Sequence, residues 1–99
     1  MEYRRFGNTI YLRLDPKEEI LEEIGKVAEK ENIRLAQVTG LGAINDFTAG
    51  VYNTVTKEYH SIQFQGAFEI VSLTGTVTRK DGDVYLHLHI AAGDEEGHV

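Results

Sequence analysis

The sequence contains no cysteine and no tryptophan, only one proline, and no long apolar run. Without cysteine there is no disulfide framework and no thiolate ligand, so any metal ion must be held by histidine, aspartate or glutamate. No apolar run approaches the roughly 20 residues that span a bilayer, and no signal-peptide core follows Met1. The 99 residues therefore predict a single cytoplasmic domain over 1–99, with no membrane segment.

Basic residues are also scarce, because ten Lys and Arg face sixteen Asp and Glu, for a formal net charge of −6. Nonspecific affinity for nucleic acid comes largely from Lys and Arg that displace counterions from phosphates. The only basic doublets are Arg4-Arg5 and Arg79-Lys80. We therefore expect the isolated chain to bind duplex DNA weakly or not at all at physiological salt.

The most informative stretch is Asp83 to Ala91, where apolar and polar residues alternate with the period of a half-buried strand. Its polar face carries His87 and His89 at i and i+2, about 6.5 Å apart along the strand. Two imidazoles at that spacing can converge on one divalent ion, and zinc is the ion expected first among those that prefer nitrogen. The same spacing also fits ordinary histidines on the half-exposed face of a sheet.

Two other residues are candidates for the same site. By strict alternation Glu69 shares an apolar face with Val71 and Leu73, where a carboxylate is costly unless it is paired, near an ion or in reach of water. Strict alternation also places it opposite the histidines, so an acid–base role beside them would require a bulge. His98, in an acidic C-terminal run, could fold back as a metal ligand. No Gly-x-Ser-x-Gly elbow occurs, so acyl-transfer chemistry has no support.

The clearest helix is predicted from Pro16 to Glu31, with Asp15 as N-cap and Glu18 completing a capping-box-like pair. One apolar stripe at helical spacing should face the core. The stripe consists of Ile20, Leu21, Ile24, Val27 and Ala28.

About six strands are expected around this helix, at Ile10–Leu14, Leu35–Val38, Asp46–Tyr52, Glu58–Gln65, Phe68–Thr78 and Asp83–Ala91. Gly40–Ala43 indicates a tight turn or bulge, and Asn45 stands where a dinucleotide fingerprint needs its third glycine, so no nucleotide cofactor is expected. Asp81-Gly82 is a strong two-residue hairpin signal. Together these elements predict an α+β fold, a mostly antiparallel sheet with one main helix packed on it.

Four segments in order resemble the PPC (plants-and-prokaryotes conserved) domain: Gly40–Ile44, Gly50–Tyr52, Phe68–Gly75 and Tyr85–His89. The resemblance covers essentially the whole chain and implies an antiparallel sheet flanked by helical segments, assembled as a homotrimer. Free-standing prokaryotic members are often described as predicted DNA-binding proteins, and plant members bind AT-rich DNA through AT-hooks. The fold also resembles that of acetolactate decarboxylase, in which a histidine cluster holds zinc.

The sequence departs from the family pattern in two ways. It has no AT-hook, and it stops at Val99, where the family continues into Gly-Gly-His-Leu and at least one more strand. The family's third histidine is therefore absent, and another residue, water or subunit would have to replace it. The resemblance favours a DNA-associated regulatory module with a His-x-His metal site. The alternative is a small metal-dependent enzyme acting on an oxo-acid-like substrate, with Glu69 as its acid–base group.

Overall fold

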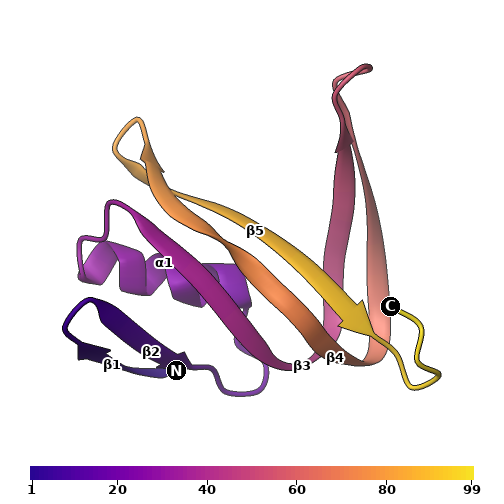
Figure 1. Ribbon diagram of the computed structural model, residues 1–99, viewed down its shortest axis with the longest axis horizontal. Coiled ribbons are helices and arrows are strands. Elements are labelled where there is room, and N and C mark those ends of the chain that lie inside the picture. Colours follow the sequence, from indigo (N-terminus) through magenta and orange to yellow (C-terminus); the bar gives the residue numbers. More distant parts are fainter. The chain divides into compact units, whose positions relative to one another are not determined.

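The computed structural model describes residues 1–99 as five strands and one helix (Figure 1). In chain order these are β1 (Glu2–Phe6), β2 (Thr9–Arg13), α1 (Ile20–Lys30), β3 (Ala36–Asn53), β4 (Glu58–Lys80) and β5 (Asp83–Gly93). β1 pairs with β2, while β3, β4 and β5 form a second sheet in that order. A sheet-dominated α+β chain with one short helix is therefore confirmed. The helix is not long and apolar enough to cross a membrane.

The chain divides into two compact units. Unit 1 consists of Met1–Ala36 and Thr76–His87, and unit 2 consists of Gln37–Gly75 and Leu88–Val99. β4 and β5 contribute residues to both units. The buried apolar residues are few: Val27, Ala28 and Val77 in unit 1, and Ile70 in unit 2.

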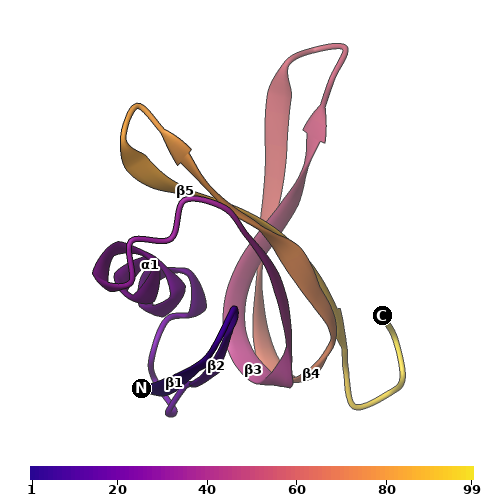
Figure 2. The same cartoon turned by 60° about the vertical axis from the view of Figure 1, so that its left-hand side comes forward.

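In unit 1, β1 and β2 form an antiparallel hairpin whose register runs from Glu2 opposite Arg13 to Phe6 opposite Thr9. Gly7 has a φ of +61°, which the tight two-residue connection requires. β1 lies beside α1 (Figure 2), and the Tyr3 hydroxyl donates a hydrogen bond to Glu31 Oε2 at 3.1 Å. β1 was not expected, because this segment lacks a regular apolar alternation.

The predicted start of the helix at Pro16 is wrong, because α1 begins at Ile20. Lys17 has a φ of +76°, which no α-helix contains. The Asp15 N–H does donate to Glu18 Oε1 at 2.6 Å, so the predicted pair forms, but it closes a turn ahead of the helix. The helix is capped instead by Glu19, which accepts a hydrogen bond from the backbone N–H of Glu22 at 2.6 Å.

The apolar stripe of α1 is confirmed in part. Val27 and Ala28 are buried and Ile20 and Ile24 are half-buried, whereas Leu21 is exposed at the edge of the stripe.

β3 and β4 each join two of the strands expected from the sequence. Of the tight turn or bulge predicted at residues 40–43, the turn does not form, because these residues lie inside β3. Gly42 has a φ of +145°, and Gly66, in the predicted gap between two strands, has a φ of +142°. Only glycine adopts such angles readily, so both positions change the backbone direction without ending the strand.

The turn between β4 and β5 forms as predicted. Asp81 and Gly82 have φ values of +53° and +87°, the two positive angles of a type I′ hairpin turn. A two-residue turn of this kind joins antiparallel neighbours. Along β5 the expected alternation also holds, because the even-numbered residues from 84 to 90 are half-buried and the odd-numbered residues from 83 to 89 are exposed.

Candidate functional site

The two histidines of β5 are both exposed, and they belong to different units. His87 is the last residue of unit 1, and the type I′ turn places it opposite Thr76 of β4, which is also exposed. His89 belongs to unit 2 and lies opposite Thr74 by the same register. Each histidine therefore shares its polar face with a threonine hydroxyl, as the sequence register predicts.

Among residues 1–99, no group of three or more His, Cys, Asp or Glu is arranged to hold a metal. Catalytic zinc sites use three protein ligands and structural sites four. Two imidazoles therefore fit a metal only with further ligands from water or from another molecule.

His98 contacts the acidic residues of its own turn in unit 2. Its Nδ1 lies 3.3 Å from Asp94 Oδ2 and 3.7 Å from Glu96 Oε2. Asp94 Oδ1 accepts hydrogen bonds from the backbone N–H groups of His98 at 2.8 Å and Glu96 at 2.9 Å. The hydrogen bond from the His98 backbone is the main cause that lowers the pKa of Asp94. His98 thus belongs to a local turn closed by Asp94.

Glu69 does not lie on an apolar face. It is exposed, and its neighbours Phe68 and Ile70 are the residues that turn inward in unit 2. Two consecutive exposed residues, Val71 and Ser72, then interrupt the alternation, which resumes with Leu73 half-buried. An exposed Glu69 is in reach of water, which is one of the conditions that makes its carboxylate affordable at this position.

The basic doublets have different surroundings in unit 1. Arg79 is largely buried, with 17% of its side chain exposed, and it pairs with Glu29 at 3.1 Å. The Lys80 ammonium lies 5.6 Å from the centre of the Tyr85 ring. Arg4 is 76% exposed, with Glu2 at 3.7 Å, and Arg5 pairs with Glu31 at 3.3 Å.

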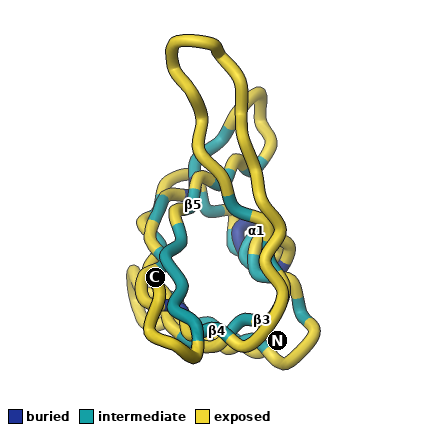
Figure 3. The backbone as a smooth tube through the Cα atoms, turned by 90° about the vertical axis from the view of Figure 1, so that its right-hand side faces the viewer, coloured by how far each residue is buried: buried dark blue, intermediate teal, exposed yellow.

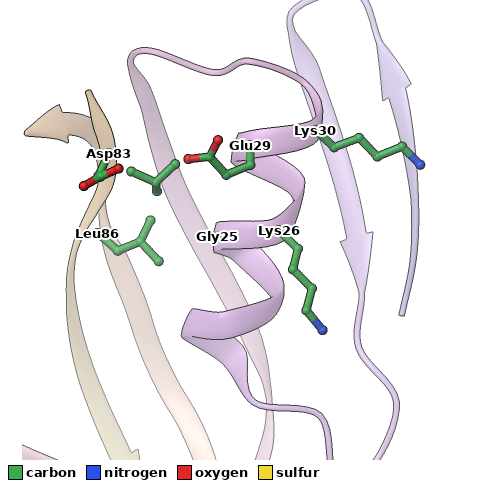
Figure 4. Close-up of a pocket in the computed structure, with 7 residues that line it drawn as sticks. Gly25, Lys26, Glu29, Lys30, Asp83 and Leu86 are labelled. Carbon is green, nitrogen blue, oxygen red and sulfur yellow. The ribbon is translucent and has the colours of Figure 1, made fainter. Parts of the chain in front are cut away.

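Unit 1 also has a shallow hollow between α1 and the start of β5 (Figure 4). Its floor includes Gly25 and the apolar residues Val84 and Leu86. Lys26 and Lys30 point away from β5 in this view. With an open form and no cluster of polar groups directed into it, the hollow lacks the features of an enclosed ligand site.

The arrangement defines a class of protein: a small β-rich domain with long paired strands and histidines on an exposed strand face. The model of the Plants and Prokaryotes Conserved (PCC) domain, the family written PPC above, matches residues 1–99. The chain belongs to this family. No curated protein matches the chain.

Solved structures show the same fold. A candidate DNA-binding protein from Bacteroides thetaiotaomicron is 30% identical, with a TM-score of 0.92, over 97% of this chain and 67% of that one. A plant- and prokaryote-conserved protein from Pyrococcus horikoshii is 36% identical, with a TM-score of 0.82, over 87% and 60% of the two chains. A metal-containing protein from Archaeoglobus fulgidus is 31% identical, with a TM-score of 0.81, over 85% and 60%. The chain thus spans between 60% and 67% of the length of these relatives.

Proposed function

We propose that this chain is a DNA-associated regulatory module that assembles as a homotrimer. The observation that carries the proposal is its membership of the PPC family together with its 30% identity to a candidate DNA-binding protein. Its association with DNA is indirect, through partner proteins or through surfaces that the trimer creates.

The charges support an indirect mode of association. A net charge of −6 repels a polyanion on average, and three copies triple that charge. Of the four residues in the basic doublets, Arg79 is held by α1 and Arg5 by Glu31. Strong salt-sensitive DNA binding takes about 6–10 phosphate contacts, more than the remaining cations of these doublets supply.

The proposal is tested by crosslinking a tagged chain in living cells of its own host and sequencing the DNA recovered with it. Recovery of specific DNA segments, beside a purified chain that gives no gel shift at physiological salt, is the expected result. Absence of crosslinked DNA above the level of an unrelated tagged protein would contradict the proposed association.

The second part of the proposal is a divalent-metal site at His87 and His89, with zinc as the first candidate. Support comes from the i, i+2 spacing on the exposed face of β5 and from the 31% identity to a protein described as metal-containing. Water or a neighbouring copy would supply the remaining ligands. A zinc ion at such a site would activate a bound water or polarise a carbonyl group.

A small metal-dependent enzyme acting on an oxo-acid-like substrate is the second candidate function. The observation in its favour is the break in the alternation of burial at Val71 and Ser72, since a bulge there would bring Glu69 to the side of β4 that carries Thr74. In that case Glu69 would be the acid–base group beside the metal. Metal-dependent turnover of small oxo-acids, abolished by His87→Ala, would favour the enzyme over the module. The likeness to acetolactate decarboxylase and the cytoplasmic location stay predictions.

A further inference from the structure

The hairpin of β1 and β2 in unit 1 has two faces of different chemistry. Residues that lie directly opposite each other in an antiparallel pair point to the same face. One face, which we call the outer face, consists of three opposed pairs: Glu2 with Arg13, Arg4 with Tyr11, and Phe6 with Thr9. All six residues are exposed, and exposed residues are yellow in Figure 3.

The other face of the hairpin holds it against α1. The Tyr3 hydroxyl donates a hydrogen bond to Glu31 Oε2 at 3.1 Å, and Arg5 Nη1 donates to Glu31 Oε1 at 3.3 Å. The half-buried residues Leu12 and Ile10 lie opposite Tyr3 and Arg5, on this same face. Because the hairpin is fixed from this side, the outer face is ordered before any ligand binds, which lowers the entropy lost on binding.

Two aromatic rings stand on the outer face. Phe6 is 64% exposed and Tyr11 is 73% exposed. Tyr11 lies two residues beyond Thr9, the partner of Phe6, so the two aromatic residues are diagonal neighbours. Diagonal neighbours are about 7–8 Å apart, within reach of aromatic side chains. The solvent face of an antiparallel sheet normally carries polar residues, so these two rings form an unusual surface for flat ligand groups.

The hairpin is also the basic part of an acidic chain. Residues 1–13 contain three arginines and one glutamate, which leaves a charge of +2, whereas the whole chain carries −6. Arg13 pairs with Asp15, but Arg4 is 76% exposed and has Glu2 at 3.7 Å. Exposed ion pairs of this kind are weak, so the Arg4 guanidinium can exchange Glu2 for an anionic ligand. The outer face thus places a guanidinium directly opposite the Tyr11 ring.

Rings and a guanidinium on one face fit a single-stranded nucleic acid. Proteins bind single strands by stacking bases on aromatic side chains while cations contact the phosphates. Bases of a duplex are stacked on one another, so a duplex would offer this face mainly its phosphates. The few cations of the hairpin are too few for strong binding by phosphate contacts alone. Single-stranded DNA and single-stranded RNA share the chemistry that the outer face can recognise.

We propose that the outer face of the β1–β2 hairpin binds single-stranded nucleic acid. Phe6 and Tyr11 stack on bases, and Arg4 contacts a phosphate. This activity goes beyond the indirect association with duplex DNA and does not rest on it, so either can fail without the other.

Fluorescence anisotropy tests the proposal with labelled oligo(dT), oligo(rU) and a duplex, each about 12 nucleotides or base pairs long, within the usual site size. Phe6→Leu/Tyr11→Leu keeps apolar side chains on the outer face but removes both rings. Tyr85→Leu is its control, because Tyr85 is an exposed aromatic residue of unit 1 outside the hairpin. Arg4→Gln is compared with Arg34→Gln, which removes the same charge from an exposed position outside the hairpin.

At about 50 mM salt we expect the wild type to bind at least one of the single strands with a micromolar dissociation constant, at least about ten times more tightly than the duplex. Loss of both rings should raise this constant about tenfold or more. Arg4→Gln should reduce the slope of log K against log salt by about 0.7, as loss of one phosphate contact does on a single strand. Tyr85→Leu and Arg34→Gln should behave as the wild type.

A measurement on the wild type alone makes the test independent of the variants. Addition of the bound oligonucleotide should shift the backbone amide resonances of residues 2–13 more than those of the rest of the chain. Failure to bind either single strand, equal affinity for the duplex, or unchanged binding after loss of both rings would overturn the proposal. Binding to vesicles of anionic phospholipid in place of the oligonucleotides would also overturn it and assign the outer face to a lipid surface.

Discussion

Arg79 of β4 donates a hydrogen bond from Nη2 to the main-chain carbonyl of Ala28 in α1, at 3.2 Å. Its Nε donates to the carbonyl of Ile33 at 3.0 Å, and its Nη1 to the carboxylate of Glu29 at 3.1 Å. The Ala28 carbonyl also accepts a hydrogen bond from the backbone N–H of Ile33 at 2.9 Å, so the guanidinium adds a second donor there and ties β4 to the C-terminal end of α1 and to the segment that follows it.

Replacing Arg79 with methionine should lower the free energy of unfolding by about 1–3 kcal/mol, because the Ile33 carbonyl loses this donor and the Ala28 carbonyl keeps only the Ile33 N–H. The control is Arg4→Met, since Arg4 is 76% exposed and its acidic partner is 3.7 Å away. Its effect should stay below about 0.5 kcal/mol. Urea denaturation at one protein concentration measures both variants, and equal losses would contradict the role of Arg79.

Duplex DNA should bind the purified chain no better than micromolar at physiological salt. A test of basic residues has to keep Arg79, because its loss would change the fold as well as the charge. Arg4→Gln/Lys80→Gln removes one exposed cation from each doublet instead. Submicromolar binding of AT-rich duplex by the wild type, lost in this double variant, would contradict the indirect mode.

Zinc bound to protein purified without a histidine tag should fall in His87→Ala and in His89→Ala. His60→Ala is the matched control, because His60 is also an exposed strand histidine but lies near the start of β4, far from His87 and His89 in the sequence. Elemental analysis after dialysis measures the zinc content. Equal zinc in the wild type and the two β5 variants would remove the proposed site.

The N-terminal ammonium of Met1 lies 2.8 Å from Glu18 Oε1 and 2.9 Å from Asp15 Oδ2. Hydrogen bonds to Glu18 and Asp15 raise the pKa of this ammonium, while its own hydrogen bonds lower the pKa values of both carboxylates. Because its pKa is raised in the folded protein, the Met1 ammonium contributes its full stabilisation at pH values below its ordinary pKa of about 8. This contribution is lost as the pH rises through the pKa that the ammonium has in the folded protein.

The stability contributed by the carboxylates of Asp15 and Glu18 depends on pH in the opposite direction, because their pKa values are lowered in the folded protein. Their contribution is complete above their ordinary pKa values of about 4 and is lost as pH falls through the lower folded values. The thermal unfolding midpoint should therefore fall both as the pH drops below about 4 and as the pH rises above about 8. Acetylation of the N-terminus should remove the alkaline loss, and an unchanged alkaline profile would contradict the assignment.

Two glycines should respond to alanine in opposite directions. A Cβ at Gly50 would lie 2.8 Å from Ser61 Cα and would clash with the carbonyl oxygen of His60, so Gly50→Ala should open the pairing between the end of β3 and the start of β4. Faster hydrogen exchange of the backbone amides in these two segments measures this. Gly25 in α1 has open space around its Cβ position, so Gly25→Ala should stabilise the fold by about 0.5–1 kcal/mol. A stabilised Gly50→Ala protein would show that the strands are less close than described.

Features that depend on local chemistry could be predicted from the sequence. Asp81-Gly82 determines its own turn, because both residues tolerate the positive φ that a type I′ turn requires. The buried residues Val27 and Ala28 follow from helical spacing alone. The hairpin of β1 and β2 could have been predicted from Gly7-Asn8, a recognised two-residue turn signal, although β1 lacks the apolar alternation of a typical strand.

Features that depend on distant parts of the chain could not be predicted. The positive φ of Lys17 moves the start of α1, and the type of residue gives little indication of it. Gly42 and Gly66 marked the places where the backbone turns, but pairing over the whole length of β3 and β4 keeps these strands continuous. The break in the alternation of burial at Val71 and Ser72 has no local signal in the sequence.

The division of unit 1 into two chain segments also has a consequence for how fast the protein folds. Met1–Ala36 and Thr76–His87 can meet only after the intervening residues 37–75 have been closed into a loop, and closure of a long loop slows folding. The hairpin that starts at Asn53 removes this delay, because zipping from its short turn brings the far ends of β3 and β4 together one pair at a time. The Asn53 side chain accepts hydrogen bonds from the backbone of this turn, at Val55 and Thr56. It is thus placed to influence the rate at which Arg79 reaches its hydrogen-bond partners at the end of α1.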